Sequence, residues 1–158
     1  MSLSVRQAKT GDDQIIHDFI CKLADYEKLR HRVQVTLADI NRDFFGNTPR
    51  VFCDLAFWNG RPAGFSIWFY DYSTFRGRAG IYLEDLFVDE DVRGHGIGKA
   101  LFGNLAQRCA DEKLPRLKWS VLDWNAPSIA FYDSLGAVMQ KEWLGYDLTG
   151  DALRGLAT

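Results

Sequence analysis

The sequence has little of what several common protein classes require. It holds only three cysteines, Cys21, Cys53 and Cys109, which form no CxxC pair and no cluster with the histidines. This argues against a disulfide framework or a metal site, and we expect three reduced, mostly buried thiols. The chain also lacks a basic excess, since its formal net charge is −2. No nucleic-acid partner is therefore expected, because a surface for nucleic acid needs such an excess.

Long apolar runs are missing as well. No segment is long enough to span a membrane, and the first residues, MSLSVRQAKTGDDQ, contain no apolar core of a secretion signal. We therefore expect a cytoplasmic protein with no membrane partner. No linker, repeat or low-complexity segment interrupts the 158 residues, of which 47% are hydrophobic. This predicts a single domain over residues 1–158 with a substantial core.

Periodicity and turn signals predict an α/β fold around a mixed sheet. The expected strands cover residues 3–8, 50–58, 61–72, 80–88, 116–124 and 141–148. The expected helices cover residues 10–29, 36–45, 97–113 and 125–137. Asn59-Gly60 is a strong hairpin signal, so the early strands should be antiparallel. The crossover through the helix at 97–113 predicts one parallel pair, between the strands at 81–88 and 117–122.

Three helix starts carry capping residues. Asp12 or Asp13 can cap the first helix, and Asn125 can cap the last. Thr36 and Asp39 have the spacing of a capping box in which Asp replaces the usual Glu. These signals fix the helix starts better than periodicity alone.

The stretch VRGHGIGKAL, residues 92–101, is dense in glycine. Gly94, Gly96 and Gly98 do not fit the dinucleotide fingerprint, and the P-loop pattern also fails, because Arg93 stands where that motif needs glycine. The pattern R-x-x-G-x-G fits, between a strand and a helix. Backbone N–H groups up to about Lys99 could converge there on an anion at a helix N-terminus. By itself the stretch could equally be a plain turn.

LEDLFVDEDVRGHGIGKAL, followed by LDWNAPSIAFYDSLGA, resembles the acetyl-CoA site of the GCN5-related N-acetyltransferase (GNAT) superfamily. LADYEKL, STFRGR and IYLED extend the likeness to the spermidine/spermine N1-acetyltransferase (diamine acetyltransferase) group, and within it to the thialysine N-acetyltransferase branch. The resemblance covers nearly the whole chain. It implies a mostly antiparallel sheet with one splayed parallel strand pair, flanked by helices. It also implies an N-acetyltransferase that uses acetyl-CoA and no metal.

The resemblance also assigns site residues. Those implied to bind acetyl-CoA are Leu86, Phe87, Val88, Arg93, Gly94, His95, Gly96, Ile97, Gly98, Lys99, Asn125, Ser128 and Tyr132. The side chains of Phe87 and Val88 could equally be simple core. In catalysis, Tyr132 would protonate the leaving thiolate and Glu84 would assist deprotonation of the amine. Residues implied to lie near the acceptor are Tyr26, Glu27, Glu84 and Asp85. Strand alternation should send Glu84 and Asp85 to opposite faces.

The acceptor is expected to be a small primary amine, such as a polyamine or a thialysine-like amino acid. The chain departs from the polyamine enzymes at KLRHR, residues 28–32, where those enzymes carry acids, and at Ser73, where they carry an aspartate. Specificity for spermidine is therefore not implied. A peptide or protein acetyltransferase, a non-catalytic acyl-CoA sensor and an interaction domain are the alternatives. The resemblance also implies a homodimer.

Overall fold

The computed structural model describes residues 1–157. Its contacts divide the chain into two compact units, and the boundary in the sequence lies between residues 120 and 121. The first unit contains β1 (Leu3–Gln7), α1 (Asp13–Tyr26), η1 (Arg30–Arg32), α2 (Leu37–Phe45), β2 (Phe52–Trp58), β3 (Arg61–Ser73), β4 (Arg78–Val88), η2 (Glu90–Val92), α3 (Ile97–Glu112) and β5 (Leu117–Trp119). The second contains α4 (Ala126–Ser134) and α5 (Gly150–Leu156). A single domain over residues 1–158 stays a prediction.

One five-stranded sheet, in the order β1-β2-β3-β4-β5, organises the first unit. Pairing is antiparallel from β1 to β4 and parallel between β4 and β5, which confirms the predicted mixed sheet. The hairpin at Asn59-Gly60 is also confirmed. Both residues have positive φ, +50° and +78°, which is the conformation that a tight hairpin turn requires.

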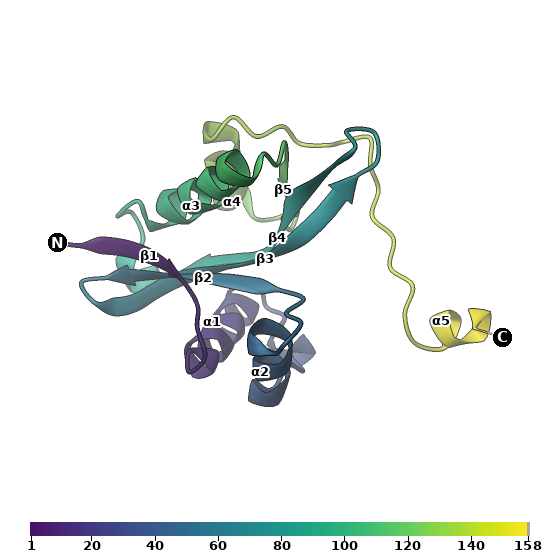
Figure 1. Cartoon of the computed structure of the whole chain (residues 1–158), viewed down its shortest axis with the longest axis horizontal. Helices are drawn as coiled ribbons and strands as arrows, with labels where there is room; N and C mark the ends of the chain where they lie inside the picture. The colour runs from purple at the N-terminus through teal and green to yellow at the C-terminus, as the bar shows by residue number, and fades with distance from the viewer. Residues whose placement is uncertain (158) are drawn as a thin grey trace. The chain divides into compact units, whose positions relative to one another are not determined.

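Helices cover both faces of this sheet, with α1 and α2 on one face and α3 on the other (Figure 1). The face toward α1 and α2 holds a core that includes Ile16, Phe19, Ile40 and Phe65, all at most 4% exposed. The face toward α3 holds a smaller core around Leu101 and Ala56. The sheet is therefore buried on both sides, as a crossover topology demands.

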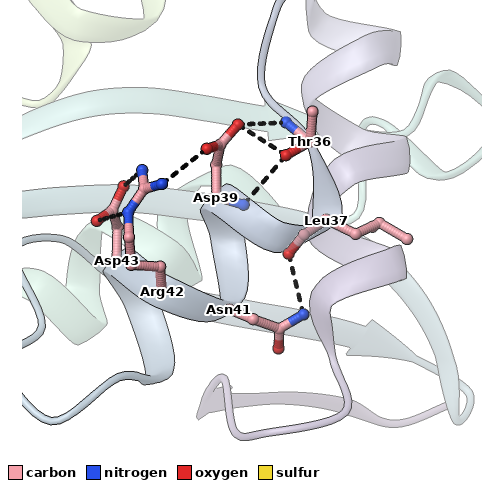
Figure 2. A network of polar contacts seen from close by, with 6 residues as sticks. All are labelled: Thr36, Leu37, Asp39, Asn41, Arg42 and Asp43. Carbon is pink, nitrogen blue, oxygen red and sulfur yellow. Dashed lines mark hydrogen bonds and ion pairs between the residues drawn. The ribbon is translucent and has the colours of Figure 1, made fainter.

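Two of the three predicted caps form as expected. Thr36 Oγ1 accepts a hydrogen bond from the backbone N–H of Asp39, and the Asp39 carboxylate accepts one from the backbone N–H of Thr36 (Figure 2). Asn125 Oδ1 accepts from the backbone N–H of Ser128 and caps α4. Asp12 stands at the N-cap of α1, but its carboxylate instead accepts from the Arg6 side chain and the Lys9 backbone.

Two strand predictions need correction. The strand expected at 116–124 is much shorter, since β5 covers only Leu117–Trp119. The strand expected at 141–148 is wrong: this segment has no regular structure, and every residue in it is exposed. Its apolar pattern resembles that of a strand, but a strand needs a neighbour, and it pairs with no strand among residues 1–157. The short helix α5 that follows was not predicted.

Candidate active site

The strand β4 carries a bulge at its two acidic residues. Ile67 of β3 pairs with Asp85, but the next pair along β3 is Trp68 with Leu83, so Glu84 has no residue opposite it. An unpaired extra residue of this kind interrupts the ladder and bends the strand. The expectation that Glu84 and Asp85 point to opposite faces assumed regular alternation, and the bulge interrupts that alternation at Glu84. Asp85 shares a face with Ile67, which belongs to the core under α1 and α2.

Asp85 lies in an acidic surrounding that disfavours its charge. Burial, the nearby Glu84 carboxylate and the Glu27 carboxylate together raise the pKa of Asp85 to about 7. Glu27, which directly follows α1, is half-buried, and burial raises its pKa as well. Glu84 is exposed. The end of α1 and the bulge of β4 thus bring together Glu27, Glu84 and Asp85, which the sequence had assigned to the acceptor.

The second half of β4 has one edge without a strand neighbour. The parallel ladder with β5 runs from Ile81–Leu117 to Leu83–Trp119 and no further within residues 1–157. On its other edge the same segment pairs with β3, for example through Phe87 and Phe65. Because β5 ends at Trp119, the backbone groups of residues 84–88 that face away from β3 have no β5 partner, and the splayed pair that the resemblance implied stays a prediction.

Side chains in this half of β4 belong to the core. Phe87 is 5% exposed and its ring centroid lies 6.1 Å from that of Phe19. Leu86 and Val88 pack against the core on the α3 side. Any role of these residues toward a ligand therefore falls to their backbone.

The glycine stretch forms the turn between β4 and α3. Gly94 and Gly96 have φ of +82° and +79°, in the left-handed region that other residues rarely adopt. Gly96 is the N-cap of α3, and as a glycine it has no side chain to cap the first amides of the helix. Ile97, Gly98 and Lys99 follow in the first turn of α3. No acidic residue occupies the first turn, so no side-chain charge there opposes an anion that backbone N–H groups and the helix dipole would attract.

His95 and Arg93 hold this turn through their side chains. His95 Nδ1 lies 3.0 Å from the Val92 carbonyl oxygen, and its ring centroid lies 4.8 Å from that of Trp58. Arg93 Nε donates to the Val88 carbonyl oxygen at 3.1 Å. The Arg93 guanidinium carbon also lies 4.9 Å from the centroid of the Tyr26 ring. The turn is thus attached to β2, to the end of β4 and to the end of α1.

The remaining predicted site residues lie in the second unit, on or next to α4. Asn125, at 7% exposure, caps the helix through the backbone of Ser128. Tyr132 is half-buried on α4, and its ring centroid lies 5.8 Å from that of Phe131. The cap and the helix therefore hold these three residues on one short element.

The described part of the chain has three further features. No group of three or more His, Cys, Asp or Glu side chains there could hold a metal ion. No helix among residues 1–157 is both long and apolar enough to cross a bilayer. Burial raises the pKa of the Cys53 thiol well above its usual value and raises that of Cys109. Neither thiol is therefore activated as a nucleophile.

Sequence reasoning missed a polar cluster on the α3 face of the sheet. Trp68 Nε1 donates to Asp54 Oδ2 at 2.9 Å, and both residues are at most 1% exposed. Burial raises the pKa of Asp54. The alternation of β2 could have shown an aspartate at a core position, between apolar neighbours. An open hollow of about 410 Å³ on α3, lined by Asn104, Gln107, Arg108, Asp111 and Glu112, includes none of the predicted site residues.

Known proteins resemble this chain over nearly its whole length. The model of the acetyltransferase (GNAT) family matches residues 16–137. A thialysine N-epsilon-acetyltransferase of Bos taurus is 35% identical over 164 aligned positions, covering 97% of this chain and 96% of that protein. The L-ornithine N5-acetyltransferase NATA1 of Arabidopsis thaliana is 36% identical over 80% of this chain and 52% of its own length. Among solved structures, an integron cassette protein from the mobile metagenome of V. cholerae superposes with a TM-score of 0.82 at 25% identity, covering 99% of this chain and 98% of its own.

Proposed function

Because the chain belongs to the acetyltransferase (GNAT) family, we propose that it transfers the acetyl group of acetyl-CoA to a primary amine of a small molecule. One observation carries the proposal. The half of β4 without a β5 neighbour ends at Val88, a few residues before the turn at the N-terminus of α3. An extended arm can pair with the strand edge while a pyrophosphate sits on the turn, so these elements fit coenzyme A.

The residues proposed to hold acetyl-CoA divide by element. The backbone of Leu86, Phe87 and Val88 would pair with the pantetheine arm. The turn and the first turn of α3 would hold the pyrophosphate through Arg93, Gly94, His95, Gly96, Ile97, Gly98 and Lys99. Asn125, Ser128 and Tyr132 are the other residues that we propose to bind acetyl-CoA. The bound acetyl-CoA supplies a thioester whose carbonyl carbon is open to attack.

The proposed mechanism is direct transfer without an acyl-enzyme. Glu84 accepts a proton from the ammonium group of the acceptor, directly or through water, and this frees the nitrogen lone pair. Backbone N–H groups near Phe87 donate to the thioester carbonyl oxygen as the new C–N bond forms. Tyr132 then donates its proton to the sulfur as the C–S bond breaks, and the second proton released by the new amide nitrogen restores the Tyr132 hydroxyl through solvent. Asp85, with its pKa near 7, is a second carboxyl group able to exchange a proton at neutral pH.

The acidic surrounding favours a cationic acceptor. An alkyl ammonium group bound near Glu27, Glu84 and Asp85 would relieve the mutual repulsion of these carboxylates. The relatives named above are thialysine and L-ornithine acetyltransferases, and both names denote amino acids with a side-chain amine. We therefore propose a small amino acid with a side-chain amine over a long polyamine.

Release of the free thiol of coenzyme A tests this function. Acetyl-CoA would be incubated with spermidine, spermine, putrescine, thialysine, ornithine, lysine and a short peptide. We expect turnover with a small amine, and we expect Tyr132→Phe to lower kcat about 100-fold or more if Tyr132 is the general acid. Tyr72→Phe is the matched control, because Tyr72 is 62% exposed.

Three other outcomes are informative. Turnover with the peptide alone would favour a protein acetyltransferase. Binding of acetyl-CoA without turnover on any acceptor would favour an acyl-CoA sensor. Equal kcat values for Tyr132→Phe and Tyr72→Phe would remove Tyr132 from the mechanism.

We further propose that the protein is a homodimer. The segment from Val138 to Leu148 exposes Trp143, Leu144 and Tyr146 to 78%, 80% and 93%. Large apolar side chains exposed together are typical of a protein–protein interface. Light scattering after size exclusion should give the mass of a dimer, and Trp143→Ser with Leu144→Ser should shift it toward the monomer. A monomeric wild-type protein would contradict this proposal.

We also propose a cytoplasmic location. Cys21, Cys53 and Cys109 are all free thiols, and free thiols persist in a reducing compartment. Cell fractionation should recover the protein with the cytoplasmic markers. Recovery with membranes or in the medium would contradict this.

A further inference from the structure

Arg93 connects three elements that surround the proposed site. It stands at the C-cap of η2 and is the first residue of the turn that leads to α3. Its Nε donates to the carbonyl oxygen of Val88, the last residue of β4. Its guanidinium carbon lies 4.9 Å from the ring centroid of Tyr26 and 5.7 Å from that of Phe87. The cation therefore faces aromatic rings of both α1 and β4.

Tyr26 is the last residue of α1, and the next residue, Glu27, is one of the acids gathered around Asp85. Glu27 lies close enough to Asp85 for its charge to raise the pKa of that carboxyl group. The Arg93–Tyr26 contact thus joins the proposed coenzyme A turn to the helix end that presents Glu27. The turn and the helix end are far apart in sequence, so this side-chain contact is what links them.

A second contact joins the same two segments one helical turn earlier. Lys22 Nζ lies 2.5 Å from Asp89 Oδ2. Lys22 and Tyr26 are four residues apart on α1, so they share one face of the helix. Asp89 and Arg93 are also four residues apart, at the two ends of the η2 segment. The last turn of α1 and residues 89–93 are therefore attached at two points.

We propose that Arg93 is a positioning residue that couples the coenzyme A turn to the acceptor side, through its contact with Tyr26. The inference rests on the proposed function. A ligand that fixes the backbone of the turn also fixes the Arg93 side chain, and with it the end of α1. The ordering cost is then shared, so coenzyme A and the amine favour each other's binding by one common factor. A cation–π contact at an exposed site supports a factor of about two to five.

Hydrogen exchange measured by mass spectrometry, with coenzyme A alone as the probe, tests the coupling without any acceptor. The reporters are the amides of Glu27, Lys28 and Leu29, which donate to carbonyl groups of the last turn of α1. In the wild-type protein, saturating coenzyme A should slow their exchange about twofold to fivefold. Tyr26→Leu should abolish this protection, whereas Tyr26→Phe should retain it because the ring remains.

A matched control separates coupling from general loosening of the helix end. Arg30 forms an ion pair with Asp25 at 2.7 Å in the same stretch of chain. Arg30→Met removes an arginine there, and the coenzyme A effect on the three reporter amides should survive. Arg93→Met should lose the effect, and Arg93→Lys should keep part of it, because lysine retains the cation but not the bond to Val88.

Kinetics supply a second readout. With the amine identified by thiol release, Tyr26→Leu should raise KM for the amine about twofold to fivefold and leave the dissociation constant of coenzyme A within twofold in calorimetry. Coenzyme A binding that gives equal protection in wild-type and Tyr26→Leu proteins would overturn the coupling and leave the proposed function standing. Absence of coenzyme A binding by the wild-type protein would overturn both.

Discussion

Ile67 of β3 lies directly opposite Asp85 of β4, so a carboxyl group shares the face of the sheet that packs beneath α1 and α2. Regular alternation from Phe87 sets this relationship, because Phe87 lies two residues after Asp85 and belongs to the same core, while the bulge at Glu84 shifts the register of Leu83 and the residues before it. The cost of ionising Asp85 there is reflected in its pKa of about 7. Its place on this face thus contributes to the raised pKa of a group in the candidate site, because burial is the largest cause of that shift.

The raised pKa of Asp85 predicts a stability that depends on pH. An acid whose pKa is higher in the folded chain binds its proton more tightly there, so its contribution is complete at low pH and is lost as the pH rises through about 7. Asp85→Asn mimics the protonated form. We expect the variant to match the wild-type free energy of unfolding at pH 3, because the difference grows only as the pH rises from about 4 to about 7, and to exceed it at pH 8.5 by at most about 4 kcal/mol. Urea denaturation at the two pH values measures this.

The control for this prediction is an exposed acid. Asp91 of η2 is exposed, and Asp91→Asn should change the free energy of unfolding by less than about 0.5 kcal/mol at either pH. Should Asp85→Asn differ from the wild type by the same amount at both pH values, ionisation of Asp85 would not be what destabilises the folded chain.

The buried Asp54–Trp68 hydrogen bond predicts a large effect from a small change. Trp68→Phe removes the indole N–H that donates to Asp54 Oδ2 and leaves the carboxylate without this donor at 1% exposure. We expect the free energy of unfolding to fall by about 2–4 kcal/mol, since an unpaired buried polar group adds to the lost packing. Phe75→Leu, at a fully exposed position, should cost under about 0.5 kcal/mol. Adding Asp54→Asn to Trp68→Phe should recover part of the loss, and no recovery would mean that packing alone explains it.

Local signals in the sequence predicted most of the first unit. The hairpin at Asn59-Gly60, the capping box at Thr36 and the crossover between β4 and β5 each rest on interactions a few residues long or on a general rule of handedness. The strand expected at 141–148 failed, because an apolar pattern does not specify a pairing partner. The bulge was also hidden, since it depends on the register of β4 against β3.

The candidate site could be predicted only by resemblance. Composition and periodicity alone left the glycine stretch open between a turn and a ligand loop, and they gave Tyr132 no role. Contacts between distant segments, such as Arg93 with Tyr26 and Lys22 with Asp89, have no local signature. They follow from how α1 packs on the sheet, which depends on many residues at once.

The capping box of α2 predicts a modest loss from one substitution. Thr36→Ala removes the oxygen that accepts from the Asp39 backbone and the hydroxyl that donates to its carboxylate (Figure 2). We expect the free energy of unfolding to fall by about 1 kcal/mol, measured by urea denaturation. Thr48→Ala, at an exposed position outside the helices and strands, should be within about 0.5 kcal/mol of the wild type. Equal effects of the two substitutions would show that the cap contributes nothing specific.

Gly96, at the start of α3, and Gly103, in its middle, should respond in opposite ways to substitution by alanine. Gly96 caps α3 with a φ of +79°, so Gly96→Ala forces a side chain into the left-handed region at the turn proposed to hold pyrophosphate. Gly103 lies in the middle of α3, exposed, with open space where a Cβ would stand. Gly103→Ala should raise the free energy of unfolding by about 0.5–1 kcal/mol and leave coenzyme A affinity unchanged. Gly96→Ala should lower stability by about 1 kcal/mol and weaken coenzyme A binding in calorimetry about tenfold or more. Loss of stability at Gly96 with unchanged affinity would mean that the turn is structural only, and the pyrophosphate would then have to be held elsewhere.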